Sequence, residues 1–338
     1  MKTLHINSSS IVKTFGQLKE QLSASYKKCF KEHCLTFDNE IGYGEVRGVL
    51  LKNNISYLEF NVTFNEDIDL NINTNISKAV NIAYCSKGKI AHQFTKKNKK
   101  TTLEPFQIGF MSNITSSKNT IYFKKETNVI VTLITAYELT ASVKKNTVHQ
   151  ELFETFVKNK KENNVFISSH NLKIAEKIEQ VTKIKEDGVM RSLLIEGIVH
   201  MVLALEIQQY KRDLKNSKQP TGSLTLREMQ EIKEISTYIK NYPERATTIE
   251  DLCKKTGVTS SKLQEGFKLM HNTTVNDFIR TERVKKSEEL IKNSDLNISQ
   301  IVYSVGFSSR SYFCKIFKQK YNCTPTEYKS RIKLAATA

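Results

Sequence analysis

Residues that build metal and redox sites are scarce in this sequence. The cysteines form no CxxC pair and show no zinc-ligand spacing; the six are Cys29, Cys34, Cys85, Cys253, Cys314 and Cys323. The run from Cys29 to Cys34, which contains His33, is a weak candidate for a metal site. His92 is the one histidine between residues 41 and 137, and it belongs to no HxH pattern. We therefore expect no metal, no cofactor and no catalytic residue.

Long hydrophobic runs are missing as well. The N-terminal residues are polar and contain no apolar core of signal-peptide length. The most apolar segment, 193–207, is interrupted by Glu196, His200 and Glu206, so it is not predicted to span a membrane. These two absences predict a cytoplasmic protein with reduced thiols and no membrane partner.

Acidic residues are unevenly distributed. The 338 residues carry a net charge of +17, which favours a polyanionic partner, either nucleic acid or a membrane surface. The net charge alone does not show that the protein binds a polyanion, because an AT-rich coding sequence yields much lysine and asparagine without selection for binding. The stretch 296–326, however, has no Asp or Glu in a chain with 35 acidic residues. This stretch predicts a surface that faces phosphate; its basic residues include Arg310, Lys315, Lys318 and Lys320.

Residues 41–137 show the pattern of short β-strands. Runs rich in β-branched and aromatic residues alternate with polar turns. The spacing favours a β-sandwich or a small barrel, with a cupin-like jelly roll as the natural choice, over a parallel sheet. The seven runs are Glu45–Leu51, Ser56–Phe64, Ala79–Cys85, Lys89–Phe94, Phe106–Met111, Thr120–Lys124 and Val129–Tyr137.

From about Gln150 the apolar period becomes helical. Two stripes on either side of Gly188 predict a helical hairpin with one long apolar face. That face either packs on its own β-domain or forms a homodimer interface, and one face can do both. The stripes are Ile174, Ile178, Val181 and Ile184, then Leu194, Ile198, Val202 and Leu205.

Two C-terminal segments, 249–267 and 299–317, repeat one layout. In each, a short helix ends at a glycine, Gly257 or Gly306, which can take positive φ and so turn the chain sharply. An apolar residue then plugs the corner, and Thr259 or Ser308 is predicted to cap the next helix. Apolar pairs four residues apart hold that helix to the core and leave its other face free for a major groove. The pairs are Leu263/Phe267 and Phe313/Phe317.

Capping signals support these helix boundaries. Thr248, Thr274 and Thr324 each precede an acidic residue by three positions, and Asn297 precedes Gln300 in the same way. The helix predicted over 275–292 would be roughly 27 Å long. A spacer of that length can hold two recognition helices about one DNA turn, ~34 Å, apart.

With these features, residues 232–331 resemble the DNA-binding domain of the AraC/XylS family. The most specific runs are Val305–Ser308, Ser311–Phe313, Phe317–Lys318 and Thr324–Tyr328. The resemblance implies two recognition helices in successive major-groove segments, an N-terminal sensing or dimerising domain, and usually gene activation. It thus implies promoter DNA and RNA polymerase as partners. The run 42–51 resembles the siderophore-responsive, pyochelin-regulator-like branch, which implies an iron chelate or another small metabolite as effector.

The expected architecture is an α+β multidomain protein. Residues 1–148 are predicted to form a β-rich sensing domain, a β-sandwich of cupin-like type, and residues 149–214 a helical dimerisation segment. A polar stretch with Pro220 and Gly222 predicts a linker over 215–225. Residues 226–334 are predicted to be an all-α double helix-turn-helix domain.

Several positions depart from the family pattern, among them Cys253 and Val302, which stand where small residues are usual. Asn272 and Asn322 stand where the family usually has glycine, and asparagine tolerates the left-handed conformation next best. Glu265 occupies a position that is often basic, although a glutamate can accept a hydrogen bond from cytosine N4. Gly266 costs about 1 kcal/mol of helix propensity. We therefore expect base readout mainly from the second recognition helix.

The predicted DNA contacts lie on and around the two recognition helices. Tyr312, Phe313 and Phe317 are predicted to turn inward, and Arg310 or Lys315 to read a guanine through O6 and N7. The base-reading set is Arg310, Ser311, Lys315, Ser261, Lys262, Gln264 and Glu265. The phosphate-contacting set is Thr259, Ser260, Lys268, Arg283, Lys285, Lys286, Ser309, Lys318 and Lys320.

Three functions fit these patterns to different degrees. The leading one is a homodimeric transcription regulator, an activator by resemblance, that responds to a small molecule. The second is an effector-independent regulator controlled by its own level. An enzyme fused to a DNA-binding unit, such as a repair alkyltransferase, would need an activated cysteine or a metal cluster. Neither Cys29–Cys34 nor Cys85 offers that context, so we expect no enzyme.

Overall fold

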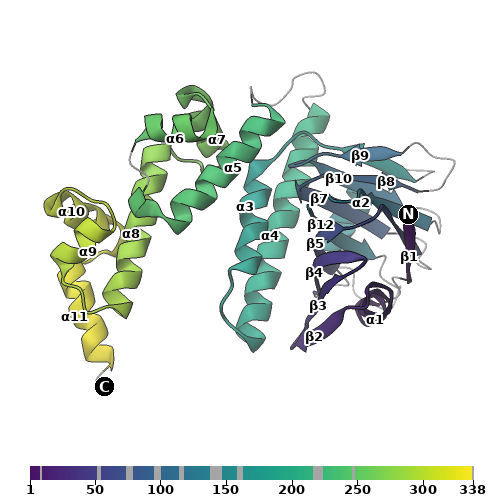
Figure 1. The fold of residues 1–338 in the computed structure, drawn as a ribbon, viewed down its shortest axis with the longest axis horizontal. Helices are drawn as coiled ribbons and strands as arrows, with labels where there is room; N and C mark the ends of the chain where they lie inside the picture. The colour runs from purple at the N-terminus through teal and green to yellow at the C-terminus, as the bar shows by residue number, and fades with distance from the viewer. Residues whose placement is uncertain are drawn as a thin grey trace. The chain divides into compact units, whose positions relative to one another are not determined.

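The computed structural model divides the chain into two compact units, residues 1–221 and 222–338 (Figure 1). It describes residues 1–7, 10–51, 55–73, 79–94, 100–113, 118–137, 147–157, 163–215, 224–245 and 248–336. Residues 216–223 of the predicted linker therefore lie outside the described residues.

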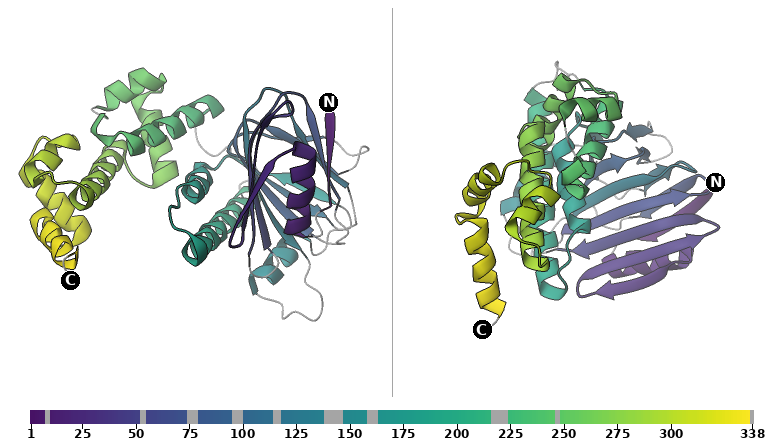
Figure 2. Two further views of the ribbon diagram at one scale, coloured as in Figure 1. Left: turned by 60° about the horizontal axis from the view of Figure 1, so that its bottom comes forward. Right: turned by 60° about the vertical axis from the view of Figure 1, so that its left-hand side comes forward.

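The first unit is built on two β-sheets (Figure 2). The five-stranded sheet has the order β1-β6-β11-β8-β9, and the eight-stranded sheet has the order β13-β10-β7-β12-β5-β4-β3-β2. The strands are β1 (Lys2–Asn7), β2 (Ser25–Cys29), β3 (Glu32–Asn39), β4 (Gly42–Leu50), β5 (Ile55–Phe64), β6 (Ile68–Asn73), β7 (Ala79–Lys87), β8 (Ile90–Gln93), β9 (Thr101–Leu103), β10 (Ile108–Asn113), β11 (Lys118–Phe123), β12 (Val129–Tyr137) and β13 (Asn164–Ile167). Each of the seven predicted runs overlaps a strand, which confirms the β-sandwich.

Alternation along the strands places the core between the sheets. Val129, Val131 and Leu133 of β12 are buried in one cluster with Phe60 of β5 and Phe123 of β11. The rings of Phe60 and Phe123 lie 6.0 Å apart between the two sheets. Each such buried side chain stabilises the fold by roughly 1.5–3 kcal/mol. Helix α1 (Ile11–Leu22), which the sequence patterns did not predict, packs against β1, β3 and β4.

Three helices follow the strands: α2 (Thr147–Phe156), α3 (Leu172–Thr182) and α4 (Gly188–Lys215). The predicted hairpin is formed by α3 and α4, which lie side by side along the outer face of the eight-stranded sheet (Figure 1). Tyr210 of α4 anchors this packing, because its ring lies 5.0 Å from that of Phe110 in β10. The predicted stripe is split: Val202 is buried, Ile198 and Leu205 are half-buried, and Leu194 is exposed.

Among the described helices, α4 is the one long and apolar enough to cross a membrane by length and composition. One such helix is weak evidence for a membrane span. Here the helix lies against a β-sheet, and its buried face includes a glutamate, Glu206. The interruption by polar residues seen in the sequence is therefore part of how the helix packs.

The second unit is all-helical. Its elements are α5 (Leu226–Asn241), the short 3-10 helix η2 (Pro243–Arg245), α6 (Ile249–Thr256), α7 (Ser260–His271), α8 (Val275–Asn293), α9 (Ile298–Ser304), α10 (Arg310–Tyr321) and α11 (Pro325–Ala336). The pairs α6/α7 and α9/α10 are the two predicted helix-turn-helix units, and α8 lies between them in the chain. This confirms the predicted all-α double helix-turn-helix architecture.

The predicted caps set the ends of these helices. The hydroxyls of Thr248 and Thr274 accept hydrogen bonds from backbone N–H groups three residues on, at 3.1 and 3.2 Å. Asn297 and Gln300 form a reciprocal capping box at the start of α9. Asn272 and Asn322 both adopt φ 56°, as expected for asparagine in place of glycine. A capping side chain of this kind contributes about 1 kcal/mol.

Candidate DNA-binding surface

Two glycine turns orient the helices α7 and α10. Gly257 has φ +68° and Gly306 has φ +88°, a region that other residues enter only with strain. Val258 and Phe307, which follow them, are buried in the corners between the helices. Each turn therefore fixes the direction in which the next helix leaves the core, as the sequence predicted.

The packing of α10 presents one face to solvent. Phe313 and Phe317 are fully buried in a core with Val284 of α8. Arg310, Ser311 and Lys315 are exposed on the opposite side. Among the described residues, neither Arg310 nor Lys315 is held by a hydrogen bond or an ion pair, so both cationic heads are available to a ligand.

Two details of α10 differ from the sequence predictions. The N-cap is Ser309 and not Ser308, because the Ser309 hydroxyl accepts the hydrogen bond from Tyr312 N at 3.3 Å. Tyr312 does not turn inward: its side chain is 44% exposed and lies on the solvent side of α10. Its ring is 5.6 Å from the guanidinium carbon of Arg280 in α8, which also pairs with Asp277 at 2.8 Å. Sequence reasoning missed Arg280, although Asp277 three residues earlier signals a paired arginine on one helix face.

Part of the α7 contact set is already engaged within the domain. Lys262 donates to both carboxylate oxygens of Glu228 in α5, at 2.7 and 2.9 Å. The side-chain oxygen of Gln264 accepts a hydrogen bond from Val275 N at the start of α8. Thr259 occupies the N-cap position of α7, but its side chain makes no capping hydrogen bond. The exposed predicted residues on α7 are Ser260, Ser261 and Lys268, and Glu265 is half-buried.

Gly266, although unfavourable for a helix, allows close packing between α7 and α5. A methyl group built on Gly266 would lie 2.3 Å from Cδ1 of Ile232 in α5. The glycine therefore lets α5 and α7 approach closely, and the propensity cost is offset by burial of Ile232. Because α5 holds α7 in this way, the contact sets the position of the first recognition helix.

The predicted phosphate contacts on α8 are also partly engaged. Arg283 donates to the carbonyl oxygens of Pro243 at 3.0 Å and Gly306 at 2.7 Å. It therefore connects η2 to the glycine turn between α9 and α10. Lys285 pairs with Glu282 and Lys286 with Glu289, at 2.7 and 3.1 Å. On α10, Lys318 and Lys320 are exposed. The pKa of Lys320 is nevertheless lowered, mainly because the protein partly desolvates its amine and to a smaller extent because Lys285 repels it.

The Cys29–Cys34 run, the weak metal candidate in the sequence, lies on the paired strands β2 and β3. Among the described parts of the chain, no group of three or more His, Cys, Asp or Glu side chains is placed to hold a metal ion. In the Cys29–Cys34 run, Cys29 is exposed, and Cys34 donates its S–H to Glu45 Oε1 at 2.7 Å. Burial raises the pKa of Cys34 to about 12, so this thiol stays protonated.

Comparisons with known proteins find a family match within the C-terminal unit. The family described as "Helix-turn-helix domain" matches residues 252–331. The histidine kinase P4 of Formosa agariphila is 43% identical over 75 residues, 22% of this chain and 6% of that protein. The transcriptional regulator AlkR of Acinetobacter baylyi is 27% identical over 132 residues, 39% of this chain and 43% of that protein.

The xylose operon regulatory protein of Escherichia coli K12 is 29% identical over 92 residues, which cover 27% of this chain and 24% of that protein. The chain thus spans less than half the length of these curated relatives. Among solved structures, the xylose-binding activator xylR is 28% identical and covers 32% of this chain and 28% of its own, with a TM-score of 0.28. ToxT of Vibrio cholerae is 16% identical and covers 81% of this chain and 97% of its own, with a TM-score of 0.29.

Proposed function

We propose that this chain, whose C-terminal unit is a double helix-turn-helix DNA-binding domain of the AraC/XylS family, is a homodimeric, sequence-specific regulator of transcription. The observation that carries the proposal is the pair of helices α7 and α10. Each follows a glycine turn whose next residue, Val258 or Phe307, is buried, and each keeps a polar face exposed. The domain division at 148/149, the linker 215–225 and action in the cytoplasm belong to the same proposal.

Base readout is assigned mainly to α10. Arg310 and Lys315 are exposed and unengaged among the described residues, and a bidentate arginine–guanine pair contributes about 1–3 kcal/mol of discrimination. Ser311 adds a less selective contact. On α7, Ser261 and Glu265 stay in the base-reading set, with Glu265 suited to cytosine N4. Lys262 and Gln264 would first have to leave Glu228 and Val275.

Phosphate contacts are assigned to side chains that the fold leaves accessible. Ser260, Lys268 and Lys318 are exposed and lie on the two recognition helices. Lys285, Lys286, Lys320, Thr259 and Ser309 stay in the set as secondary contacts. Arg283 is assigned instead to the connection between η2 and Gly306, because its guanidinium is directed at two carbonyl groups.

Dimerisation is assigned to the outward face of α4. Large apolar side chains are exposed there although the opposite face is packed on the sheet: Met190 is 63% and Leu193 59% exposed, and Met201 is also exposed. Gly197 on the same face has open space above it, which allows a second helix to approach closely. A second copy of this chain would bury this surface and bring two DNA-binding units to one operator, with a gain from avidity.

A small-molecule effector and contact with RNA polymerase, as expected of an activator, complete the proposal. Inside the sandwich, His92 is buried, its Nδ1 has no hydrogen-bond partner in the described part of the chain, and its Nε2 lies 3.4 Å from Asn119 Oδ1. These polar groups are suited to a polar ligand. Ferric siderophores should raise the melting temperature of the full chain. If no metabolite does so, the effector-independent regulator is the better description.

Selection of binding sites from random duplex DNA tests the central proposal. The full chain should enrich a consensus with two blocks about one helical turn apart, one for each recognition helix. Binding without enrichment of any sequence would contradict sequence-specific regulation.

A further inference from the structure

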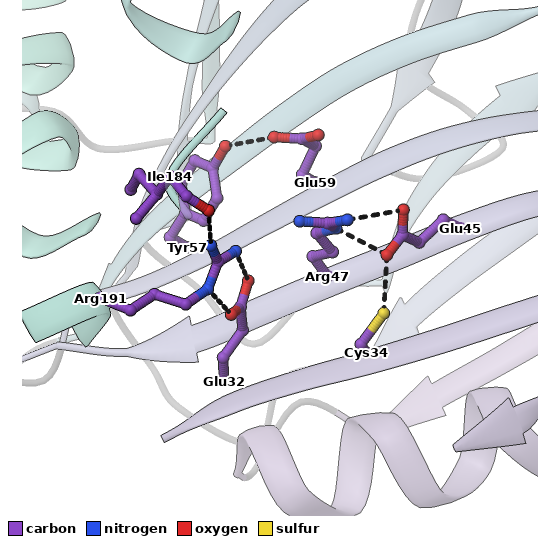
Figure 3. Close-up of polar contacts among 8 residues, drawn as sticks. All are labelled: Glu32, Cys34, Glu45, Arg47, Tyr57, Glu59, Ile184 and Arg191. Carbon is purple, nitrogen blue, oxygen red and sulfur yellow. Dashed lines mark hydrogen bonds and ion pairs between the residues drawn. The ribbon is translucent and has the colours of Figure 1, made fainter. Parts of the chain in front are cut away.

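A layer of polar side chains lies between part of α4 and the eight-stranded sheet, and Figure 3 shows its contacts around Arg191 and Arg47. At one end, Arg191 of α4 donates to both carboxylate oxygens of Glu32 in β3, at 2.6 and 3.0 Å, and to the carbonyl of Ile184 at 2.7 Å. On β4, Arg47 is held in the same bidentate way by Glu45, at 2.6 and 3.0 Å. Each of the two guanidinium groups in the layer therefore already has its own carboxylate.

Two further carboxyl groups of the layer form no ion pair among the described residues, although Arg47 stands opposite one of them, Glu59, in the register of β4 and β5. Glu59 of β5 accepts a hydrogen bond from the hydroxyl of Tyr57 at 2.6 Å. Glu206 of α4 has no exposed surface, and neither of its oxygens has a partner among the described residues. An ionised carboxylate in this position would be costly, because a buried charge without a partner loses its hydration and gains nothing in return.

The surroundings of Glu206 are phenolic, hydroxylic and apolar. Glu206 lies close enough to Tyr57 of β5 and Tyr84 of β7 that its ionised form would raise the pKa of each phenol, on which burial has the largest effect. Thr132 of β12 pairs in register with Tyr84 and Glu59, and its buried hydroxyl also has no hydrogen-bond partner among the residues that the structure describes. Helix α3, which packs against α4, carries buried apolar side chains, including Ile174 and Ile178.

We propose that α4 docks on the sheet with Glu206 in its neutral form, so that packing of the hairpin takes up one proton. The layer supplies no free cation to Glu206, and no group of metal ligands is present among the described residues. A proton is the one cation that requires no cavity. Burial raises the pKa of Glu206 well above its ordinary value of 4.5, in agreement with this placement.

The direction of the pH dependence follows from the raised pKa. Docking is fully favoured below the ordinary pKa of 4.5, where the carboxyl is neutral whether or not the helix is docked. As the pH rises from there toward the raised pKa, the docked state alone keeps its proton, and docking weakens by ~tenfold per pH unit. Because the exposed apolar face lies on the same helix, the position of that face becomes sensitive to pH.

Hydrogen exchange of the α4 backbone amides in the full chain, corrected for intrinsic exchange rates, tests the proposal. Wild type, Glu206→Gln and Glu206→Leu are compared from about pH 5 to pH 8. Glu196→Gln, which alters a half-exposed carboxylate of the same helix, is the matched control. The other titrating groups of the layer, Glu59 above all, are common to the four proteins.

The protection of α4 in wild type and in Glu196→Gln should fall relative to either neutral variant by up to ~tenfold per pH unit. Either neutral variant suffices if the other fails to fold. Parallel pH profiles for wild type and a folded neutral variant would overturn the proposal. So would a wild-type infrared spectrum that shows every buried carboxyl ionised at neutral pH.

Discussion

The contact between Gly266 and Ile232 makes a quantitative prediction about the first recognition helix. A methyl group at Gly266 would lie 2.3 Å from Cδ1, 2.8 Å from Cγ2 and 2.9 Å from Cγ1 of Ile232. Overpacking of this kind costs about 1–3 kcal/mol, whereas replacing glycine by alanine inside a helix gains about 1 kcal/mol of propensity. Gly266→Ala should therefore destabilise the unit by up to about 2 kcal/mol in net terms and shift α7.

Shortening Ile232 should reverse the sign of this effect. Ile232→Val removes Cδ1, and Ile232→Ala removes all three clashing atoms at a cost of about 2–5 kcal/mol by itself. In the Ile232→Ala background the added methyl group meets open space, so Gly266→Ala should stabilise the unit by about 1 kcal/mol. The coupling energy of the double-mutant cycle should then be about 1–3 kcal/mol, with Ile232→Val between the extremes.

Urea unfolding of the isolated fragment 224–338, monitored by circular dichroism, measures the free energy of unfolding of each protein in the double-mutant cycle. Binding of a selected operator by the same proteins reports whether α7 has moved. The reasoning fails if Gly266→Ala destabilises the fragment equally in both backgrounds, because the glycine would then be needed for something other than the approach of α5. It also fails if Gly266→Ala stabilises the wild-type fragment.

Three further predictions concern DNA binding and assembly. Arg310→Ala should cost about 1–3 kcal/mol on the selected operator and far less on random DNA; an unchanged consensus in site selection would reject direct readout by Arg310. The double variant Lys268→Ala, Lys318→Ala should weaken binding to all DNA sequences alike and lower the slope of log K against log salt concentration by about two units. Arg283→Met should instead lower the stability of fragment 224–338 by about 1.5–3 kcal/mol and leave that slope unchanged. An unchanged slope in the lysine variant, or a reduced slope in Arg283→Met, would reverse these assignments. Residues 1–215 should sediment as a dimer and Leu193→Asp should convert it to a monomer; a wild-type fragment that is monomeric at high concentration would remove α4 from the dimer model.

Much of the C-terminal unit could be predicted because its signals are local. A glycine that ends one helix, a capping residue that starts the next and apolar residues four apart lie within one short segment. The prediction that Asn272 and Asn322 tolerate the left-handed conformation was confirmed for the same reason, since that conformation depends on the residue itself. The cap of α10 was misplaced by one residue, because Ser308 and Ser309 carry the same hydroxyl.

Local signals were weaker in the first unit. The strand β2 was missed because its five residues are exposed and two are lysines, so no alternation marks it. β1 was missed because its partner is β6, which lies some sixty residues away and pairs with it in parallel. Helix α4 was predicted as an amphipathic helix, but it carries apolar residues both on its buried face and on its exposed face. The spacing of apolar residues in the sequence cannot tell these two faces apart.

The sequence by itself determined the elements of the double helix-turn-helix unit, the alternation of the central strands and the existence of the helical hairpin. These depend on backbone conformation and on the spacing of side chains along one element. Only the tertiary structure decided which charges are engaged and which are available. Arg283 and Arg310 are the same residue type in the same helical unit, yet one is held by two carbonyl groups and the other is exposed. That difference, like the burial of Glu206 or the need for Gly266, is set by residues distant in the chain, whose approach no local pattern records.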